Sequence, residues 1–166
     1  MRKILFAISL ITLGSLISCK KDTFDPGATV GKVVANGWWV NVQIGGANQT
    51  STPTFLSTYN TSSNTTDSMW VDDLKGYYGF KCKVATNYSN YTFSTTNSQN
   101  AYYVGTVNFP ATVTITNGKI FPKAGHSLNG NVTDSIYMQV KFSDDPSTTY
   151  TIVGTARTGF AEDDYY

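Results

Sequence analysis

"SIYMQVKFS", residues 135–143, alternates apolar and polar side chains without interruption. Its apolar side chains recur at every second position from Ile136 to Phe142. Successive side chains of a β-strand lie on opposite faces, whereas a helix repeats every 3.6 residues. The segment therefore predicts a strand with one face toward a core and the other toward solvent.

The same period of two recurs along most of the chain, between clusters of Gly, Asn, Ser and Thr that are typical of turns. Lys75-Gly76 indicates a hairpin turn, and Asn117-Gly118 is the strongest hairpin signal in the sequence. Residues 30–36 predict a short helical turn. Further strands are predicted at residues 37–46, 53–60, 67–74, 77–86, 91–96, 111–116 and 149–158, with residues 119–121 continuing beyond the Asn117-Gly118 turn.

These segments predict an all-β, antiparallel fold of about eight strands. Even spacing and one-sided alternation favour an up-and-down β-barrel, and an antiparallel β-sandwich is the alternative. No strand is continuously apolar, which argues against a parallel sheet.

The N-terminus has the pattern of a secretory signal peptide. "MRK" precedes an apolar run that is shorter than the ~20 residues of a transmembrane helix. Leu16-Ile17-Ser18-Cys19 resembles the bacterial lipobox, in which the cysteine receives diacylglycerol and becomes the first residue of the mature chain. Two or more acyl chains anchor a protein stably to a bilayer. We therefore expect a signal peptide at residues 1–18, a lipidated tether at 19–29 and one β-barrel domain at 30–166.

The residue after the cysteine bears on the membrane to which the protein is sorted. Lys20 follows Cys19 where Asp would resemble an inner-membrane retention signal, so we expect the outer membrane. Lys20-Lys21-Asp22 loosely resembles a surface-export signal but has one acid instead of two. Both the periplasmic and the external face stay open.

Charge argues against nucleic acid as a partner. The sequence has 12 Lys and Arg residues and 11 Asp and Glu residues, and without Arg2 and Lys3 ten basic residues remain. These are not gathered into a basic run, so we expect no nucleic-acid partner. One histidine and one cysteine besides Cys19 make a poor ligand set, and we expect neither a metal nor another cofactor.

The residue types that catalysis requires are sparse. Cys82 alternates with Phe80 and Val84, which predicts a buried structural side chain. His126 is the one histidine available as a base, and "KAGHSLNG" predicts an exposed loop. The sequence therefore shows no catalytic constellation, which weighs against an enzyme.

Three pairs of adjacent aspartates are candidates for acid–base groups. Neighbours on a strand point to opposite faces, so one pair cannot converge on a substrate without a bulge. We expect these carboxylates to lie at strand ends and turns and to accept backbone hydrogen bonds. The pairs are Asp72-Asp73, Asp144-Asp145 and Asp163-Asp164.

With the strands placed, residues 36–166 resemble the lipid-binding putative hydrolase family of bacterial lipoproteins. "MWVDDL" (69–74) and "RTGFAEDDY" (157–165) carry the most specific part of the resemblance. The resemblance implies a lipocalin-like β-barrel and a lipid-binding role, with hydrolysis as the other activity in the family description. It carries over no catalytic residue.

The favoured hypothesis is an envelope lipoprotein whose barrel binds a lipid, such as palmitate, or another small apolar ligand. The alternatives are a lipid or ester hydrolase and a surface module for a glycan or protein partner. An apolar cavity would support the first, and a filled barrel with an exposed Trp39 or Tyr77 would support the surface module. The predicted ligand-binding residues are Tyr78, Phe80, Phe93, Val113, Ile115, Met138 and Phe142.

Two serines fit an Asp-Ser-apolar acceptor pattern for O-glycosylation. They are Ser68, in Asp67-Ser68-Met69, and Ser135, in Asp134-Ser135-Ile136.

Overall fold

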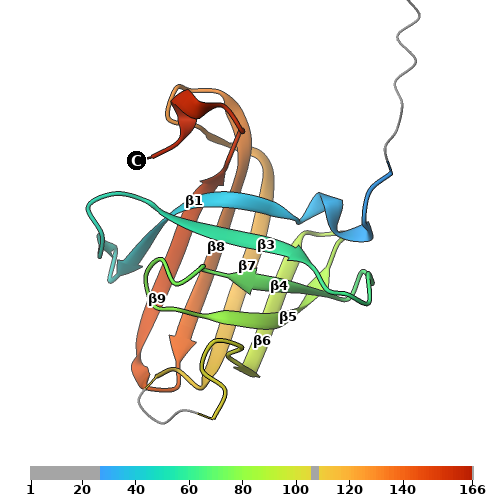
Figure 1. The fold of residues 1–166 in the computed structure, drawn as a ribbon. Helices are drawn as coiled ribbons and strands as arrows, with labels where there is room; N and C mark the ends of the chain where they lie inside the picture. Colours follow the sequence, from blue (N-terminus) through green and yellow to red (C-terminus); the bar gives the residue numbers. More distant parts are fainter. Residues whose placement is uncertain (1–26, 106–108, 166) are drawn as a thin grey trace, which may run out of the picture.

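A computed structural model describes residues 27–105 and 109–165, which form nine β-strands and two short 3₁₀-helices (Figure 1). The elements are η1 (Val30–Val33), β1 (Asn36–Ile44), β2 (Ala47–Asn48), β3 (Thr54–Asn60), β4 (Ser68–Asp72), β5 (Lys81–Asn87), β6 (Thr92–Gln99), β7 (Thr112–His126), β8 (Val132–Phe142), β9 (Asp145–Ala156) and η2 (Ala161–Asp163).

Eight of these strands close into a barrel. From β3 onward each strand pairs antiparallel with the next, and β1 pairs with both β3 and β9. The closing ladder runs from Trp38 opposite Ala156 to Ile44 opposite Tyr150. β2 is an extra two-residue strand against the end of β1. The predicted antiparallel up-and-down barrel is confirmed, and the sandwich alternative is wrong because the first and last strands join.

The barrel encloses a continuous apolar core. The segment that predicted the fold is β8, and its inward side chains from Ile136 to Phe142 are buried. The same alternation buries Val40 and Val42 on β1. Removal of apolar area from water contributes roughly 25 cal/mol per Å². The residues between these positions are mainly polar, and they lie on the outer face of the barrel, toward solvent.

Two local predictions are confirmed. The helical turn expected within residues 30–36 is η1, and the turn expected at Lys75-Gly76 lies between β4 and β5. The strand predicted for residues 77–86 begins only at Lys81, because residues 77–80 belong to the loop that follows β4.

The hairpin predicted at Asn117-Gly118 is wrong. β7 runs through both residues as one long strand, and the register against β8 shifts between Thr116 and Lys119. Asn117 has φ +53°, the conformation a type I′ turn needs, but here it serves a bulge. Gly118 lies under Phe93, since an added Cβ would stand 2.5 Å from that ring. Glycine is therefore required for close packing and does not mark a chain reversal.

The predictions for the N-terminal segment lie outside the described residues: the signal peptide at 1–18, Cys19, and the tether up to residue 26. Within the described part of the chain, no helix is long and apolar enough to cross a membrane.

Gly118→Ala should destabilise the barrel by roughly 1–3 kcal/mol, the usual cost of overpacking a closed core. The added methyl group would meet both the ring and the carbonyl oxygen of Phe93. Urea unfolding measures the loss, and Thr116→Ala, an exposed change on the same strand, is the control. Equal unfolding midpoints for the Gly118 variant and the wild type would contradict this role of the glycine.

Candidate functional site

Six of the seven predicted ligand-binding residues lie in the barrel core. The seventh, Tyr78, is half-buried in the loop between β4 and β5 and packs against that core. The fully buried six are Phe80, Phe93, Val113, Ile115, Met138 and Phe142.

Little empty space remains among the residues below Tyr78. The cavity there measures about 10 Å³ and is lined by residues that include Val42, Leu56, Phe80 and Ile152. Sites for drug-sized ligands measure roughly 300–1,000 Å³. The apolar interior expected from the sequence is present, but side chains fill it, and an acyl chain can enter only if some of them move.

Four aromatic rings close this end of the barrel, and we call them the aromatic mouth: Tyr77, Tyr78, Phe142 and Tyr150. Tyr78 stacks on Phe142 with ring centroids 3.7 Å apart and an interplanar angle of 7°. Tyr150 meets both rings edge-on at 5.3 Å. Tyr77 is more loosely placed, 6.3 Å from the rings of Tyr78 and Tyr150 and 36% exposed. The mouth is a plug of rings between solvent and the aliphatic core.

Two carboxylates lie at the outer rim of the aromatic mouth. The Tyr78 hydroxyl donates to Asp144 at 3.2 Å, and the Tyr150 hydroxyl donates to Asp145 at 2.9 Å. Desolvation, with the nearby carboxylates adding to it, raises the pKa of both phenols above the ordinary value. Both hydroxyls therefore keep their protons, and those protons point to the rim aspartates.

The loop that carries Tyr77 and Tyr78 is held by Asp73. This buried carboxylate accepts backbone N–H bonds from Lys75, Tyr78, Gly79 and Phe80 at 2.8–3.0 Å. The backbone N–H of Asp73 in turn donates to the Phe80 carbonyl at 3.0 Å. The chain reversal between β4 and β5 is thus organised around one side chain, as expected of an aspartate at a strand end.

The neighbouring Asp72 faces a different set of partners. It accepts hydrogen bonds from the hydroxyls of Tyr59, at 2.8 Å, and Tyr102, at 2.6 Å, and the Lys81 ammonium lies 3.7 Å away. Asp72 and Asp73 do not converge on one point, as the strand geometry predicts.

The third aspartate pair fastens the C-terminal segment to the barrel. Asp163 is buried and accepts hydrogen bonds from Thr158, Ser127 and Asn131, which hold its pKa well below the ordinary value. Asp164 pairs with Arg157 and accepts the indole N–H of Trp39 at 3.1 Å. Trp39 is therefore half-buried, and its ring meets Phe55 and Tyr165 edge-on.

Cys82 and His126 show no catalytic geometry. Burial raises the pKa of the Cys82 thiol to about 12, so it stays protonated near neutral pH. His126 is exposed, as expected, but ends β7 where a loop was predicted, and its Nδ1 lies 3.1 Å from the Gly130 carbonyl oxygen. Consecutive strands run antiparallel, so the β7–β8 connection lies at the barrel end opposite the aromatic mouth.

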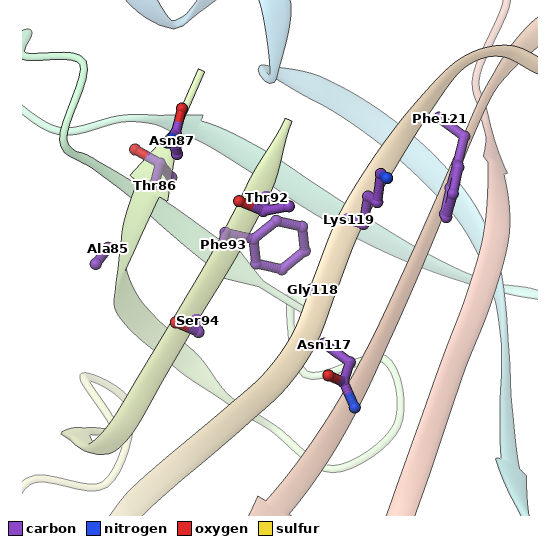
Figure 2. A pocket seen from close by; sticks show the side chains of 10 residues that line it. All are labelled: Ala85, Thr86, Asn87, Thr92, Phe93, Ser94, Asn117, Gly118, Lys119 and Phe121. Carbon is purple, nitrogen blue, oxygen red and sulfur yellow. The ribbon is translucent and has the colours of Figure 1, made fainter. Parts of the chain in front are cut away.

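A second concave feature lies on the outside of the barrel. Figure 2 shows this outer groove across β5, β6 and β7, with Phe93 beside Gly118 and with Lys119 and Phe121 further along β7. It encloses about 630 Å³ and opens broadly to solvent. The register shift between Thr116 and Lys119 on β7 falls within its lining. Asn87 and Asn117 are among its polar lining residues.

A family model described as lipid-binding putative hydrolase matches residues 23–161. The chain belongs to this family. The match and the closed barrel together fit a lipid-binding protein. No curated protein matches the chain.

The described residues contain no group of three or more His, Cys, Asp or Glu side chains placed to hold a metal ion. Of the two glycosylation candidates, Ser68 is buried on β4 with its Oγ 3.4 Å from the Thr61 hydroxyl. Ser135 is half-buried on β8. A transferase could reach Ser68 only before folding, and modification at either serine stays a prediction.

Tyr150 was not among the predicted ligand-binding residues, and Asp144 and Asp145 were expected to lie at strand ends and turns. Tyr150 follows Thr148 and Thr149 on β9, and its alternation with Ile152 was a usable signal for an inward ring. The partnership of Tyr78 and Tyr150 with the two aspartates arises across separate loops, which no local pattern encodes.

Asp73→Asn should destabilise the protein by at least about 2 kcal/mol. An amide has one acceptor oxygen where the carboxylate has two, so buried N–H donors lose partners. Urea unfolding gives the change in free energy, and near-ultraviolet circular dichroism reports the packing of Tyr78 on Phe142. Asp67→Asn, an exposed change in the loop before β4, is the matched control. An Asp73 variant as stable as that control would show that the loop does not depend on this carboxylate.

Proposed function

We propose that the protein is an envelope lipoprotein that binds an apolar ligand, without turnover, at the aromatic mouth. The observation that carries the proposal is the plug of four rings over an aliphatic core, built on a loop and on strand ends. Ligand sites are mostly apolar and carry a few polar groups that fix orientation. The mouth has this composition, with tyrosine hydroxyls at its outer edge.

Binding requires exchange of protein rings for ligand. Tyr77 is 36% exposed, and Tyr78 belongs to the loop, so both rings can turn outward without breaking a strand. A hydrocarbon chain comparable to that of palmitate would then take their place against Phe80 and Ile152. Burial of the chain contributes roughly 25 cal/mol per Å² before the costs of association and ring displacement. A dissociation constant in the micromolar range is consistent with these opposing terms.

Anchoring rests on the sequence at the N-terminus. The proposal places a cleaved signal peptide at residues 1–18 and a lipid on Cys19, with Lys20 favouring the outer membrane. An extended chain spans roughly 3.3–3.6 Å per residue, so the segment from Cys19 to Val30 can reach roughly 40 Å. The barrel is then free to turn its mouth toward or away from the membrane, on either face of it.

Two observations support binding without hydrolysis. His126 lies at the opposite end of the barrel from the mouth, and Cys82 is fully buried as a protonated thiol. A hydrolase of the serine or cysteine type needs a nucleophile and a base within hydrogen-bonding reach of each other.

A surface-binding module is the second candidate. It is favoured by the filled interior, by the exposed Tyr77 and by the larger size of the outer groove, about 630 Å³ against about 10 Å³ at the mouth. The exposed ring of Phe121 and the amides of Asn87 and Asn117 would suit a sugar or a polar peptide. Phe121→Ala tests this candidate and leaves the mouth unchanged.

Tyr78→Ala should tighten binding of N-phenyl-1-naphthylamine, a neutral apolar fluorophore, by roughly 2- to 10-fold. The ligand would no longer have to displace a stacked ring pair, which contributes ~0.5–1.5 kcal/mol. Fluorescence titration measures the dissociation constant. Tyr137→Ala, which removes a tyrosine from β8 outside the mouth, should leave it unchanged.

The outcomes separate the two candidates. Saturable binding by the wild type that tightens only in the Tyr78 variant supports the mouth. Absence of saturable binding by a folded wild type, or loss of binding in Phe121→Ala alone, would overturn the proposal. Ester hydrolysis that disappears in His126→Ala would overturn the statement that the ligand is not turned over.

Cys19→Ala should abolish incorporation of labelled palmitate into the full chain and release the protein from the membrane fraction. The reason is that no other residue of the lipobox carries a thiol for the thioether bond. Cys82→Ala is the matched control and should leave labelling unchanged. Labelling of the Cys19 variant at the wild-type level would disprove the lipobox assignment.

A further inference from the structure

Hydrogen-bond donors at the aromatic mouth are already used within the protein. The backbone N–H groups of Tyr78, Gly79 and Phe80 all donate to Asp73, which lines the cavity. The hydroxyl protons of Tyr78 and Tyr150 go to Asp144 and Asp145, as described above. What these groups present to a ligand is therefore mainly oxygen lone pairs and negative charge.

The described residues that line the cavity include no Lys, Arg or His. Lys75, in the same loop, directs its ammonium over the rings of Tyr102 and Tyr103, at 5.0 and 6.0 Å. Lys81 lies 3.7 Å from Asp72. Lys141 lines a neighbouring surface depression, which shares Phe142 with the mouth. Asp144 and Asp145 have no Lys or Arg partner within 4 Å among the described residues.

A carboxylate or phosphate head group is poorly matched to such a rim. An anion that leaves water needs donors or a cation in exchange, and like charges repel it. A hydroxyl, amide or ammonium head group brings its own donors to the carboxylates and phenol oxygens, and bonds to charged acceptors are the stronger ones. The lining has two other polar side chains, Tyr77 and Thr54. Their hydroxyls can both donate and accept hydrogen bonds, so they do not reverse this preference.

We propose that the aromatic mouth selects apolar molecules with a hydrogen-bond-donating, non-anionic head group, such as long-chain alcohols, amides and amines, over free fatty acids and phosphate-bearing lipids. This inference rests on the proposed function, because it concerns the same mouth. It narrows the ligand from any molecule with an acyl-length chain to those whose polar end complements Asp144 and Asp145.

Three ligands with the same twelve-carbon chain separate the head-group effect from the chain effect. Dodecan-1-ol, dodecylamine and dodecanoate would each be titrated at pH 7.5 against the full chain loaded with N-phenyl-1-naphthylamine. We expect the alcohol and the amine to displace the fluorophore at concentrations at least tenfold below that of dodecanoate. The amine should be the tightest of the three, since it alone adds a positive charge.

The double substitution Asp144→Asn with Asp145→Asn should reduce, by at least fivefold, the ratio of the dodecanoate concentration to the dodecylamine concentration that displaces the fluorophore. Most of this change should come from tighter binding of dodecanoate. Asp67→Asn removes a carboxylate at the other end of the barrel and should change nothing. Thermal unfolding of each variant shows whether it is folded. If the double variant is unfolded, the single variants Asp144→Asn and Asp145→Asn are titrated instead, and each should reduce the same ratio by a smaller factor.

Each outcome bears on one proposal. The head-group inference is wrong if dodecanoate binds as tightly as the alcohol, or if the double variant keeps the wild-type ratio of dodecanoate to dodecylamine displacement concentrations. Apolar binding at the mouth stands in either case. If neither the fluorophore nor any of the three ligands binds saturably, the proposed function itself fails.

Discussion

The buried carboxylate of Asp73 is the constraint on which the mouth of the barrel depends. Its two oxygens accept four backbone N–H groups from the loop between β4 and β5, and this fixes where Tyr77, Tyr78 and Phe80 lie. A loop of this kind has no ladder to satisfy its backbone donors, and buried donors without partners are costly. Asp73 therefore orders the irregular chain reversal that covers the core. It belongs to the "MWVDDL" stretch that carries the family resemblance.

The filled interior changes how ligand binding by this barrel has to be understood. With about 10 Å³ free below the aromatic mouth, the stacked rings supply in the unliganded protein the apolar contacts that a ligand would supply in the complex. Affinity then reflects the free-energy difference between two packed states, and it depends on the cost of turning the rings of Tyr77 and Tyr78 outward. The rim carboxylates act on a separate quantity, the preference among head groups, because they contact the outer ends of the tyrosines and not the core.

The sequence predicted the fold well, because a period of two is a local property and β8 displays it without interruption. The same alternation predicted which strand side chains are buried, whereas Tyr78 and Phe80 lie in the loop after β4. Asn117-Gly118 misled because a hairpin and a bulge both need a positive φ, and only packing against Phe93 distinguishes them. The start of β5 was misplaced because Asp73 replaces ladder partners for residues 78–80. Closure of the cavity depends on the summed volume of side chains from several strands, which no pattern along the chain provides.

The proposed function requires that an apolar ligand enter at the aromatic mouth by replacing its rings. The most direct test is nuclear magnetic resonance of the protein saturated with dodecan-1-ol, observing nuclear Overhauser effects between the alkyl chain and assigned side chains. We expect contacts from the alkyl chain to Phe80 and Ile152, with loss of the contacts between the rings of Tyr78 and Phe142. Contacts confined to Phe121 and Lys119, with the Tyr78–Phe142 stack intact, would place the ligand in the outer groove and rule out entry at the mouth.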